Sequence, residues 1–107
     1  MKQPRIIPCY AVIFTSTLSD FQQGYDIMSD RMRELAAQQP GYLGIESFRS
    51  PDGKGVTISY WEDLAAIQAW KQNPEHQTAQ ELGKNLWYQN YSIEIARIES
   101  GYSFDRP

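Results

Sequence analysis

Residues 41–62, GYLGIESFRSPDGKGVTISYWE, carry the pattern that decides the fold. Two runs rich in β-branched and aromatic residues, 42–49 and 55–62, flank the segment SPDGKG. The proline, aspartate and glycines of that segment are typical of a tight turn. In the second run valine, isoleucine and tyrosine occupy alternate positions, which is the two-residue period of a strand. The stretch therefore predicts a β-hairpin.

The chain before the hairpin predicts a strand and a helix. Residues 9–16, CYAVIFTS, are apolar or small at both alternating sets, as in a strand that is covered on both faces. A helix follows, with Ser19 and Gln22 as a capping box, and Pro40 ends it. Its expected buried stripe steps by three and four residues: Phe21, Tyr25, Met28, Met32 and Leu35.

The chain after the hairpin predicts a broken helix and a last strand. Residues 64–72 are helical in pattern, and Asn73 and Pro74 are a favourable cap and first residue for a second helix. That helix is expected to reach about Leu86, and residues 90–99 alternate as a strand. Its apolar stripe is Ala79, Leu82 and Leu86.

The order of these elements, β-α-β-β-α-β, predicts the ferredoxin-like α+β fold with an antiparallel sheet. We expect residues 1–107 to form a single domain, with a core over about 9–99 and a polar tail over 100–107. Two helices cover one face of such a sheet, yet the strands are apolar on both faces. A second copy related by two-fold symmetry is the usual cover, so a homodimer with sheet packed on sheet is expected.

The composition excludes several classes of function. A net charge of −3 disfavours broad nucleic-acid binding, which needs a basic face. The longest apolar runs are too short to cross a bilayer, so no membrane partner is expected. Cys9 is the only cysteine, which leaves no intrachain disulfide and no cysteine metal cluster, and it favours a buried small side chain in a cytoplasmic protein.

His76, the only histidine, is the candidate for chemistry. If Asn73 is the cap, His76 is the third residue of the helix and lies at the edge of its apolar stripe. The free N–H groups of a helix start disfavour imidazolium, so His76 should be biased towards the neutral form. The residues that share its face by helical spacing are Gln80, Gly83 and Trp87.

The tryptophans have two interpretations that the sequence leaves open. Trp61, Trp70 and Trp87 either fill the core or form an apolar slot for a flat aromatic ligand, with His76 among its few polar groups. A histidine in a first helical turn can also be only solvated. The charges of Arg49, Glu46 and Glu94 are expected to be solvated or paired at the surface.

Three segments together resemble the antibiotic biosynthesis monooxygenase family: GYLGIESFRS, ISYWEDLAAIQAWKQNPEH and WYQNYSIEIARIE. The resemblance covers roughly residues 9–99. Its most specific parts are Tyr60-Trp61-Glu62 at the end of a strand, Trp70 on the next helix, and His76 soon after. The resemblance implies a dimeric α+β barrel built from ferredoxin-like protomers.

The resemblance also implies a monooxygenase that oxidises a small aromatic or quinone-like metabolite with dioxygen and without a cofactor or metal. In that chemistry a base removes a phenolic proton, and the electron-rich anion reacts directly with dioxygen. His76 would be the base or an orienting group, Trp70 would join it as a catalytic residue, and Tyr91 would be a hydrogen-bond donor. The expected substrate-binding residues are Phe14, Trp61, Gln80, Gly83, Trp87 and Tyr91.

Two alternatives belong to other classes. Haem-degrading relatives use an Asn on the first strand, a Trp and a His ligand on the last helix, and this chain has Thr15 and Ser16 where the Asn is expected. His76 comes about one helical turn earlier than that ligand, although it would still be the iron ligand if haem were bound. The other alternative is a non-catalytic dimeric ligand-binding module whose aromatic residues fill its own pocket.

Overall fold

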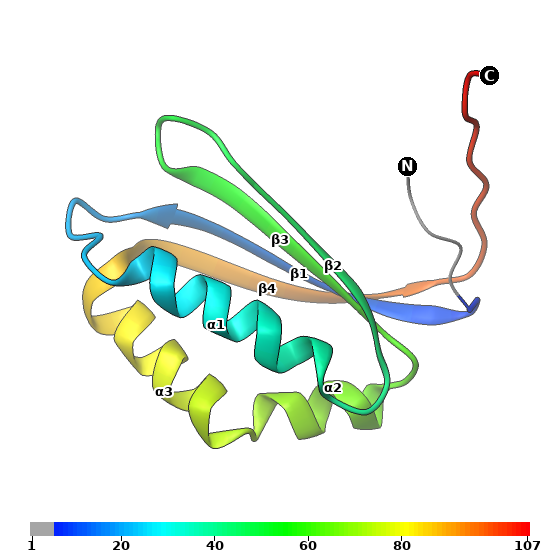
Figure 1. Ribbon diagram of the computed structural model, residues 1–107, viewed down its shortest axis with the longest axis horizontal. Helices are drawn as coiled ribbons and strands as arrows, with labels where there is room; N and C mark the ends of the chain where they lie inside the picture. The colour runs from blue at the N-terminus through cyan, green and yellow to red at the C-terminus, as the bar shows by residue number, and fades with distance from the viewer. Residues whose placement is uncertain (1–5) are drawn as a thin grey trace.

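The protein folds as a four-stranded antiparallel sheet with all its helices on one face (Figure 1). The computed structural model describes residues 6–107. The sheet order is β2-β3-β1-β4, which is the ferredoxin-like arrangement expected from the element order. The elements are β1 (Cys9–Leu18), α1 (Tyr25–Ala37), β2 (Tyr42–Arg49), β3 (Lys54–Trp61), α2 (Leu64–Lys71), α3 (Pro74–Leu82), the π-helical turn η1 (Gly83–Trp87) and β4 (Tyr88–Ile98).

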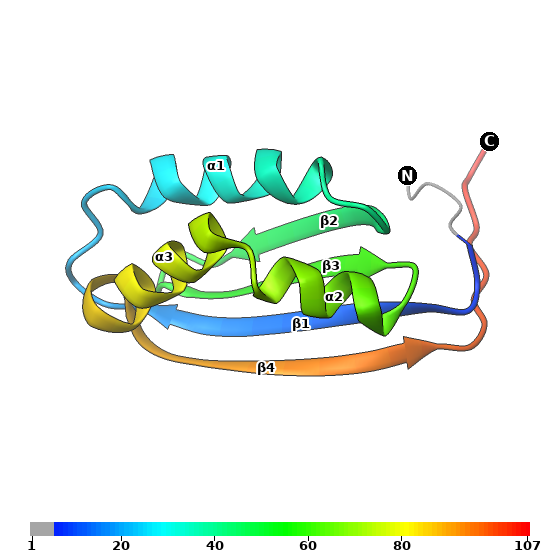
Figure 2. The same cartoon turned by 90° about the horizontal axis from the view of Figure 1, so that it is seen from below.

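The register of the sheet decides which side chains meet the helices. The central strands β1 and β3 pair Tyr10 with Trp61 and Val12 with Ser59, and these residues face the helices. The helices α1, α2 and α3 lie together on one side of the sheet (Figure 2). Successive side chains of a strand alternate between faces. The opposite face therefore carries a second apolar set from both strands: Ala11, Ile13, Val56, Ile58 and Tyr60.

The core lies where α1 and α2 cross β3. Trp61 is fully buried there, stacks on Trp70 with ring centroids 6.2 Å apart, and donates its indole N–H to the Ser59 hydroxyl at 2.9 Å. Leu35 of α1 and Ile67 of α2 close the cluster. Burying one such large side chain contributes about 1.5–3 kcal/mol, so this cluster anchors both helices on the sheet.

The start of α1 differs from the expected capping box. The helix begins at Tyr25 after Gly24, whose φ is +84°, and Ser19 is not its cap. The Ser19 hydroxyl instead donates to the Leu86 carbonyl at 2.6 Å, so it ties this loop to the end of η1. Phe21, expected in the buried stripe, is 48% exposed because it precedes the helix.

The end of the last helical segment also differs from expectation. The α-helix stops at Leu82, and one π-helical turn follows before β4. A π-turn contains an additional residue, which changes the face that later residues present. Trp87 is therefore buried, whereas Leu86, expected in the apolar stripe, is 41% exposed.

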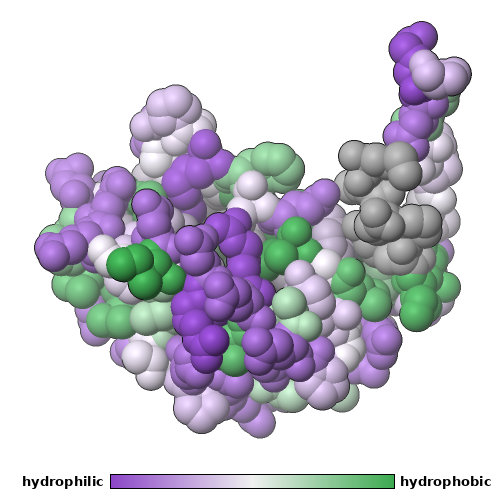
Figure 3. Space-filling view, in the orientation of Figure 1, coloured by the Kyte–Doolittle hydropathy of each residue, from purple (hydrophilic) through white to green (hydrophobic). Residues whose placement is uncertain are grey.

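The surface over the helices is mainly hydrophilic (Figure 3). The apolar face of the sheet is different, because no helix among residues 6–107 packs on it. At its edge Phe48 is 65% exposed. Among the described residues, no helix is both long and apolar enough to span a bilayer.

Gly41 is the position where a single methyl group should damage the fold most clearly. Its φ is +83°, and an added Cβ would lie 2.6 Å from the Cβ of Ala66. We expect Gly41→Ala to lower the free energy of unfolding by about 2 kcal/mol or more, as measured by urea denaturation. Gly101→Ala is the control, since a methyl group there meets only Ile7 at 4.0 Å. Equal stabilities of the two variants would contradict this account.

Candidate active site

A cavity of about 500 Å³ lies between the sheet and the helices. Its size is within the range of small-molecule sites. Most of its wall is hydrocarbon, and no Asp or Glu is among its lining residues. The sheet, α1 and α2 supply the apolar wall, which includes Val12, Phe14, Met28, Met32, Ile67 and Ile93.

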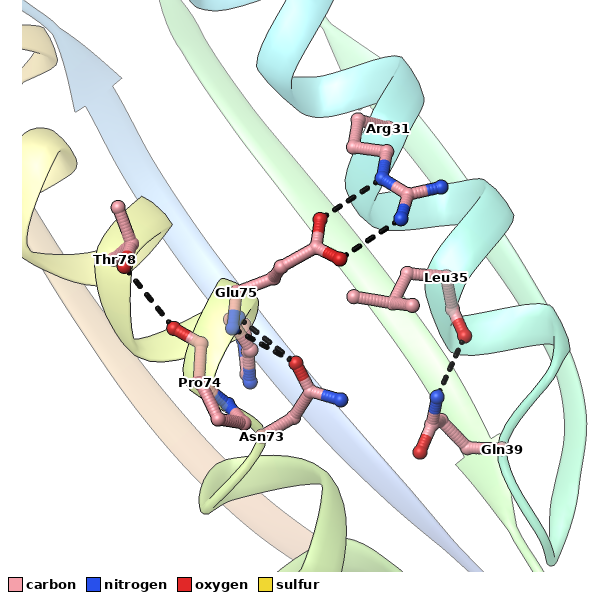
Figure 4. Close-up of polar contacts among 8 residues, drawn as sticks. Arg31, Leu35, Gln39, Asn73, Pro74, Glu75 and Thr78 are labelled. Carbon is pink, nitrogen blue, oxygen red and sulfur yellow. Dashed lines mark hydrogen bonds and ion pairs between the residues drawn. The ribbon is translucent and has the colours of Figure 1, made fainter.

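The break between α2 and α3 positions His76 at this cavity. The Asn73 side chain accepts hydrogen bonds from the amides of Glu75 and His76, at 3.0 and 3.2 Å, and so begins α3 (Figure 4). Pro74 has no N–H, although residue 74 is the position that would donate to the Trp70 carbonyl in a continuous helix. The Trp70 carbonyl accepts instead from the Asn73 amide at 3.1 Å, and its second lone pair is available to His76 Nδ1, which lies 3.0 Å from it.

This contact decides the tautomer of His76. A carbonyl oxygen can only accept, so Nδ1 carries the proton and Nε2 keeps its lone pair. The imidazole stacks on the Trp70 indole, with centroids 4.1 Å apart and an interplanar angle of 12°. No group among residues 6–107 donates to Nε2, and His76 lines the cavity.

Burial lowers the pKa of His76 below its ordinary value of 6.5, while the bond to the Trp70 carbonyl acts in the opposite direction. The neighbouring carboxylate does not counter this effect. Glu75 forms a two-point ion pair with Arg31 of α1, at 2.8 and 2.9 Å (Figure 4). His76 is therefore neutral at pH 7, with an acceptor nitrogen at an apolar cavity.

Tyrosines gather where α1 begins and η1 ends. The ring of Phe14 stacks on Tyr91 at 5.2 Å, and Tyr25 meets Tyr88 edge to face at 5.9 Å. All four line the cavity. Burial raises the pKa of the Tyr88 phenol far above its ordinary value, so that its hydroxyl stays protonated.

Six of the eight residues named as site candidates from the sequence line this one cavity: Phe14, Trp70, His76, Gln80, Trp87 and Tyr91. The other two lie outside its lining. Trp61 is behind Ser59 in the core, and the space beside Gly83 is filled by the ring of Tyr88, which would lie 2.7 Å from a Cβ there. Gly83 thus makes room for the protein's own tyrosine.

Sequence reasoning missed several lining residues. Tyr25, Met28 and Met32 had been assigned only to a buried helical stripe. The hydroxyl-bearing wall of Ser47, Thr57 and Ser59 was also missed, although Thr57 and Ser59 share the face of Trp61 by strand alternation.

The three charges expected at the surface have different environments. The Glu46 carboxylate accepts from the Tyr60 hydroxyl at 3.1 Å, and Glu94 is exposed. Arg49, expected to be solvated or paired, is half-buried and bonds neutral oxygen atoms instead. Within residues 6–107, no cluster of three or more His, Cys, Asp or Glu residues is arranged to hold a metal ion.

Residues 19–82 match the family described as "Antibiotic biosynthesis monooxygenase". The chain belongs to this family. It is 47% identical over 92 residues to the uncharacterized protein YqjZ of Bacillus subtilis, a match that covers 86% of this chain and 81% of YqjZ.

Solved structures share the fold at low sequence identity. The fold is similar to that of SnoaB, a cofactor-independent oxygenase from Streptomyces nogalater, with a TM-score of 0.71, 16% identity, and coverage of 92% of this chain and 99% of SnoaB. It is also similar to Rv0793 from Mycobacterium tuberculosis, with a TM-score of 0.78, 14% identity, and coverage of 89% and 99%.

The protonation of His76 can be followed directly, because the chain has one histidine. We expect its NMR titration midpoint in the folded protein to lie below 6.5. The unfolded chain then binds the proton more tightly, so the free energy of unfolding falls as the pH drops through the unfolded value and on through the folded one. His76→Asn should remove this pH dependence, which begins as the pH falls through the unfolded value of about 6.5. A midpoint at or above 6.5 would contradict the assignment.

Proposed function

We propose that this protein is a cofactor-independent monooxygenase that oxidises a small aromatic or quinone-like metabolite with dioxygen. The observation that carries the proposal is the unprotonated Nε2 of a neutral, half-buried histidine at an apolar cavity. Family membership and the fold likeness to SnoaB support it.

In the proposed reaction His76 is the general base. Nε2 takes the proton of an acidic hydroxyl, and the electron pair stays on the aromatic system. The resulting anion gives electrons to dioxygen and forms a carbon–oxygen bond. The O–O bond then breaks, so that one oxygen atom remains on carbon and the other leaves as water, with both hydrogens and both electrons of that water supplied by the substrate.

The cavity supports this chemistry in two further ways. Trp70 fixes the imidazole through its ring on one side and its carbonyl at Nδ1, so that Nε2 is held in one direction. The hydrocarbon wall keeps water from the anion, which protects the anion from reprotonation. Phe14, Tyr91 and Trp87 are proposed as the aromatic slot, with Gln80 as a polar contact.

A homodimer is part of the same proposal. The face of the sheet that carries Ile13, Val56 and Ile58 is apolar, and no helix of residues 6–107 covers it. A second copy packed on this face would bury these side chains. We also propose a cytoplasmic location, as expected from the lone Cys9.

The base assignment is tested with His76→Asn. The Asn side chain can still donate to the Trp70 carbonyl but has no basic nitrogen, so the fold should persist without the chemistry. Oxygen uptake is measured with a panel of mono- and dihydroxynaphthalenes. We expect the variant to be slower by roughly a hundredfold or more, with an unchanged far-ultraviolet spectrum. Gln77→Asn, at an exposed position of the same helix, is the control and should keep full activity.

Three experimental outcomes would contradict the proposal or favour one of the alternatives. Full activity of His76→Asn would remove His76 as the base. A Soret band with added haemin that His76→Asn abolishes would favour haem binding, since the free Nε2 is also an iron ligand. Absence of uptake with every compound, together with tight binding of some, would favour a non-catalytic binding module.

The dimer is tested with Ile58→Lys, which places a charge at the centre of the apolar face. We expect sedimentation of the wild-type chain at twice its mass of 12.4 kDa and of the variant as a monomer. Ile27→Lys is the matched control, because Ile27 is 79% exposed on α1. A monomeric wild-type chain, or an unchanged Ile58→Lys dimer, would contradict the proposed interface.

A further inference from the structure

Arg49, the last residue of β2, extends across its neighbouring strand towards the helices. Its partner in β3 is Gly55, and a Cβ at Gly55 would lie 2.7 Å from the guanidinium carbon. The missing side chain leaves the path open to β1 and α1. There Nη2 donates to the Ser16 hydroxyl at 2.9 Å and to the Tyr25 hydroxyl at 3.2 Å.

The charge of Arg49 is not neutralised by the protein. Within residues 6–107 no Asp or Glu forms an ion pair with it, and its partners are the neutral oxygen atoms of Ser16, Tyr25 and the Gly53 carbonyl. Ser16 is itself buried. Arg49 is half-buried, and a cation partly withdrawn from water is normally paired, because its desolvation is costly. Arg49 therefore keeps an uncompensated positive charge behind Tyr25.

The hydroxyl groups beside Arg49 can donate to a ligand in the cavity. The Tyr25 oxygen accepts from Arg49, and a phenol that accepts still has its own hydrogen to donate. Tyr88 packs edge to face on Tyr25, and both tyrosines line the cavity. The guanidinium polarises the Tyr25 hydroxyl and strengthens it as a donor.

We propose that Arg49, Tyr25 and Tyr88 form the anion-binding end of the cavity and hold a negatively charged oxygen atom of its aromatic ligand. The two tyrosines contact that oxygen, and Arg49 is a positioning residue that acts through Tyr25. The inference rests on the proposed function only in assigning the ligand to the same cavity. It defines the ligand as an aromatic compound with an anionic or charge-accepting oxygen.

The anion-binding end lies at a distance from His76, and this separation gives the anion-binding end a role in the proposed reaction. His76 and Tyr88 are twelve positions apart along α3 and η1, which corresponds to roughly 18 Å along a helix axis. When a substrate O–H bond breaks, the proton goes to Nε2 and the electron pair stays on the substrate. Conjugation moves that charge to an oxygen at the far end, where the Tyr25 and Tyr88 hydroxyls meet it.

The test compares 2-naphthoate with 2-naphthamide by isothermal titration calorimetry. The two probes share a ring system and differ in charge. We expect wild-type protein to bind the carboxylate roughly tenfold more tightly. Arg49→Gln, Tyr25→Phe and Tyr88→Phe should each reduce this ratio towards one. Tyr25→Phe and Tyr88→Phe keep the ring packing, so they carry the test if Arg49→Gln does not fold.

Lys71→Gln is the matched control. The cavity lining contains Arg33, which is paired with Asp30, and Lys71, which forms no ion pair among residues 6–107 and lies on α2 next to Trp70. This variant should keep the preference for naphthoate. Equal affinities for both probes in the wild-type protein, failure of naphthoate to bind, or a preference lost only in Lys71→Gln would overturn the proposal.

The same titration separates this inference from the oxygenase proposal. His76→Asn should lose oxygen uptake and keep its preference for naphthoate, because Arg49, Tyr25 and Tyr88 are intact. A wild-type protein that prefers naphthoate but consumes no oxygen would contradict the oxygenase proposal alone. An active enzyme that binds both probes equally would contradict the anion-binding end alone.

Discussion

The structure of the site depends on the helix break at Pro74. Pro74 has no N–H to donate to the Trp70 carbonyl, so the helix ends there, and that carbonyl accepts from the Asn73 amide and from His76 Nδ1. The same break turns α3 back so that the imidazole lies flat on the Trp70 indole. Trp70 in turn stacks on Trp61 in the core. The reactive nitrogen is thus fixed through two ring contacts to the most buried part of the sheet.

The charges around the cavity follow from its surroundings. Carboxylates near His76 would raise the pKa of the imidazole, and the nearest one in sequence, Glu75, is bound by Arg31. Burial disfavours the charged form of both groups. It lowers the pKa of His76, which stays neutral, and raises the pKa of Tyr88, which stays protonated. The cavity therefore has an acceptor nitrogen on α3 and donor hydroxyls at the end of η1.

Much of the fold could be predicted because it is encoded locally. The turn segment defined the hairpin, and Asn73 with Pro74 defined the start of α3 as found. The predictions were wrong where contacts between residues far apart in the sequence determine the local structure. Ser19 bonds Leu86 across the chain, and this contact replaces the local capping box. The π-turn turns Trp87 inward and Leu86 outward, which a strict 3.6-residue period does not anticipate. Arg49 looked like a surface charge because its path inward depends on Gly55 of another strand.

The register of β3 also affects how a ligand would be oriented. Ser59 and Thr57 face the cavity from β3, joined by Ser47 of β2, while Val12 of β1 and Ile93 of β4 form the other half of the floor. A flat ring lying on this floor has one edge over hydroxyl groups and the other over hydrocarbon. Its two edges are therefore not equivalent. In the proposed reaction, the sheet would then determine which carbon atom of the substrate is oxidised. His76 of α3 would remove the proton.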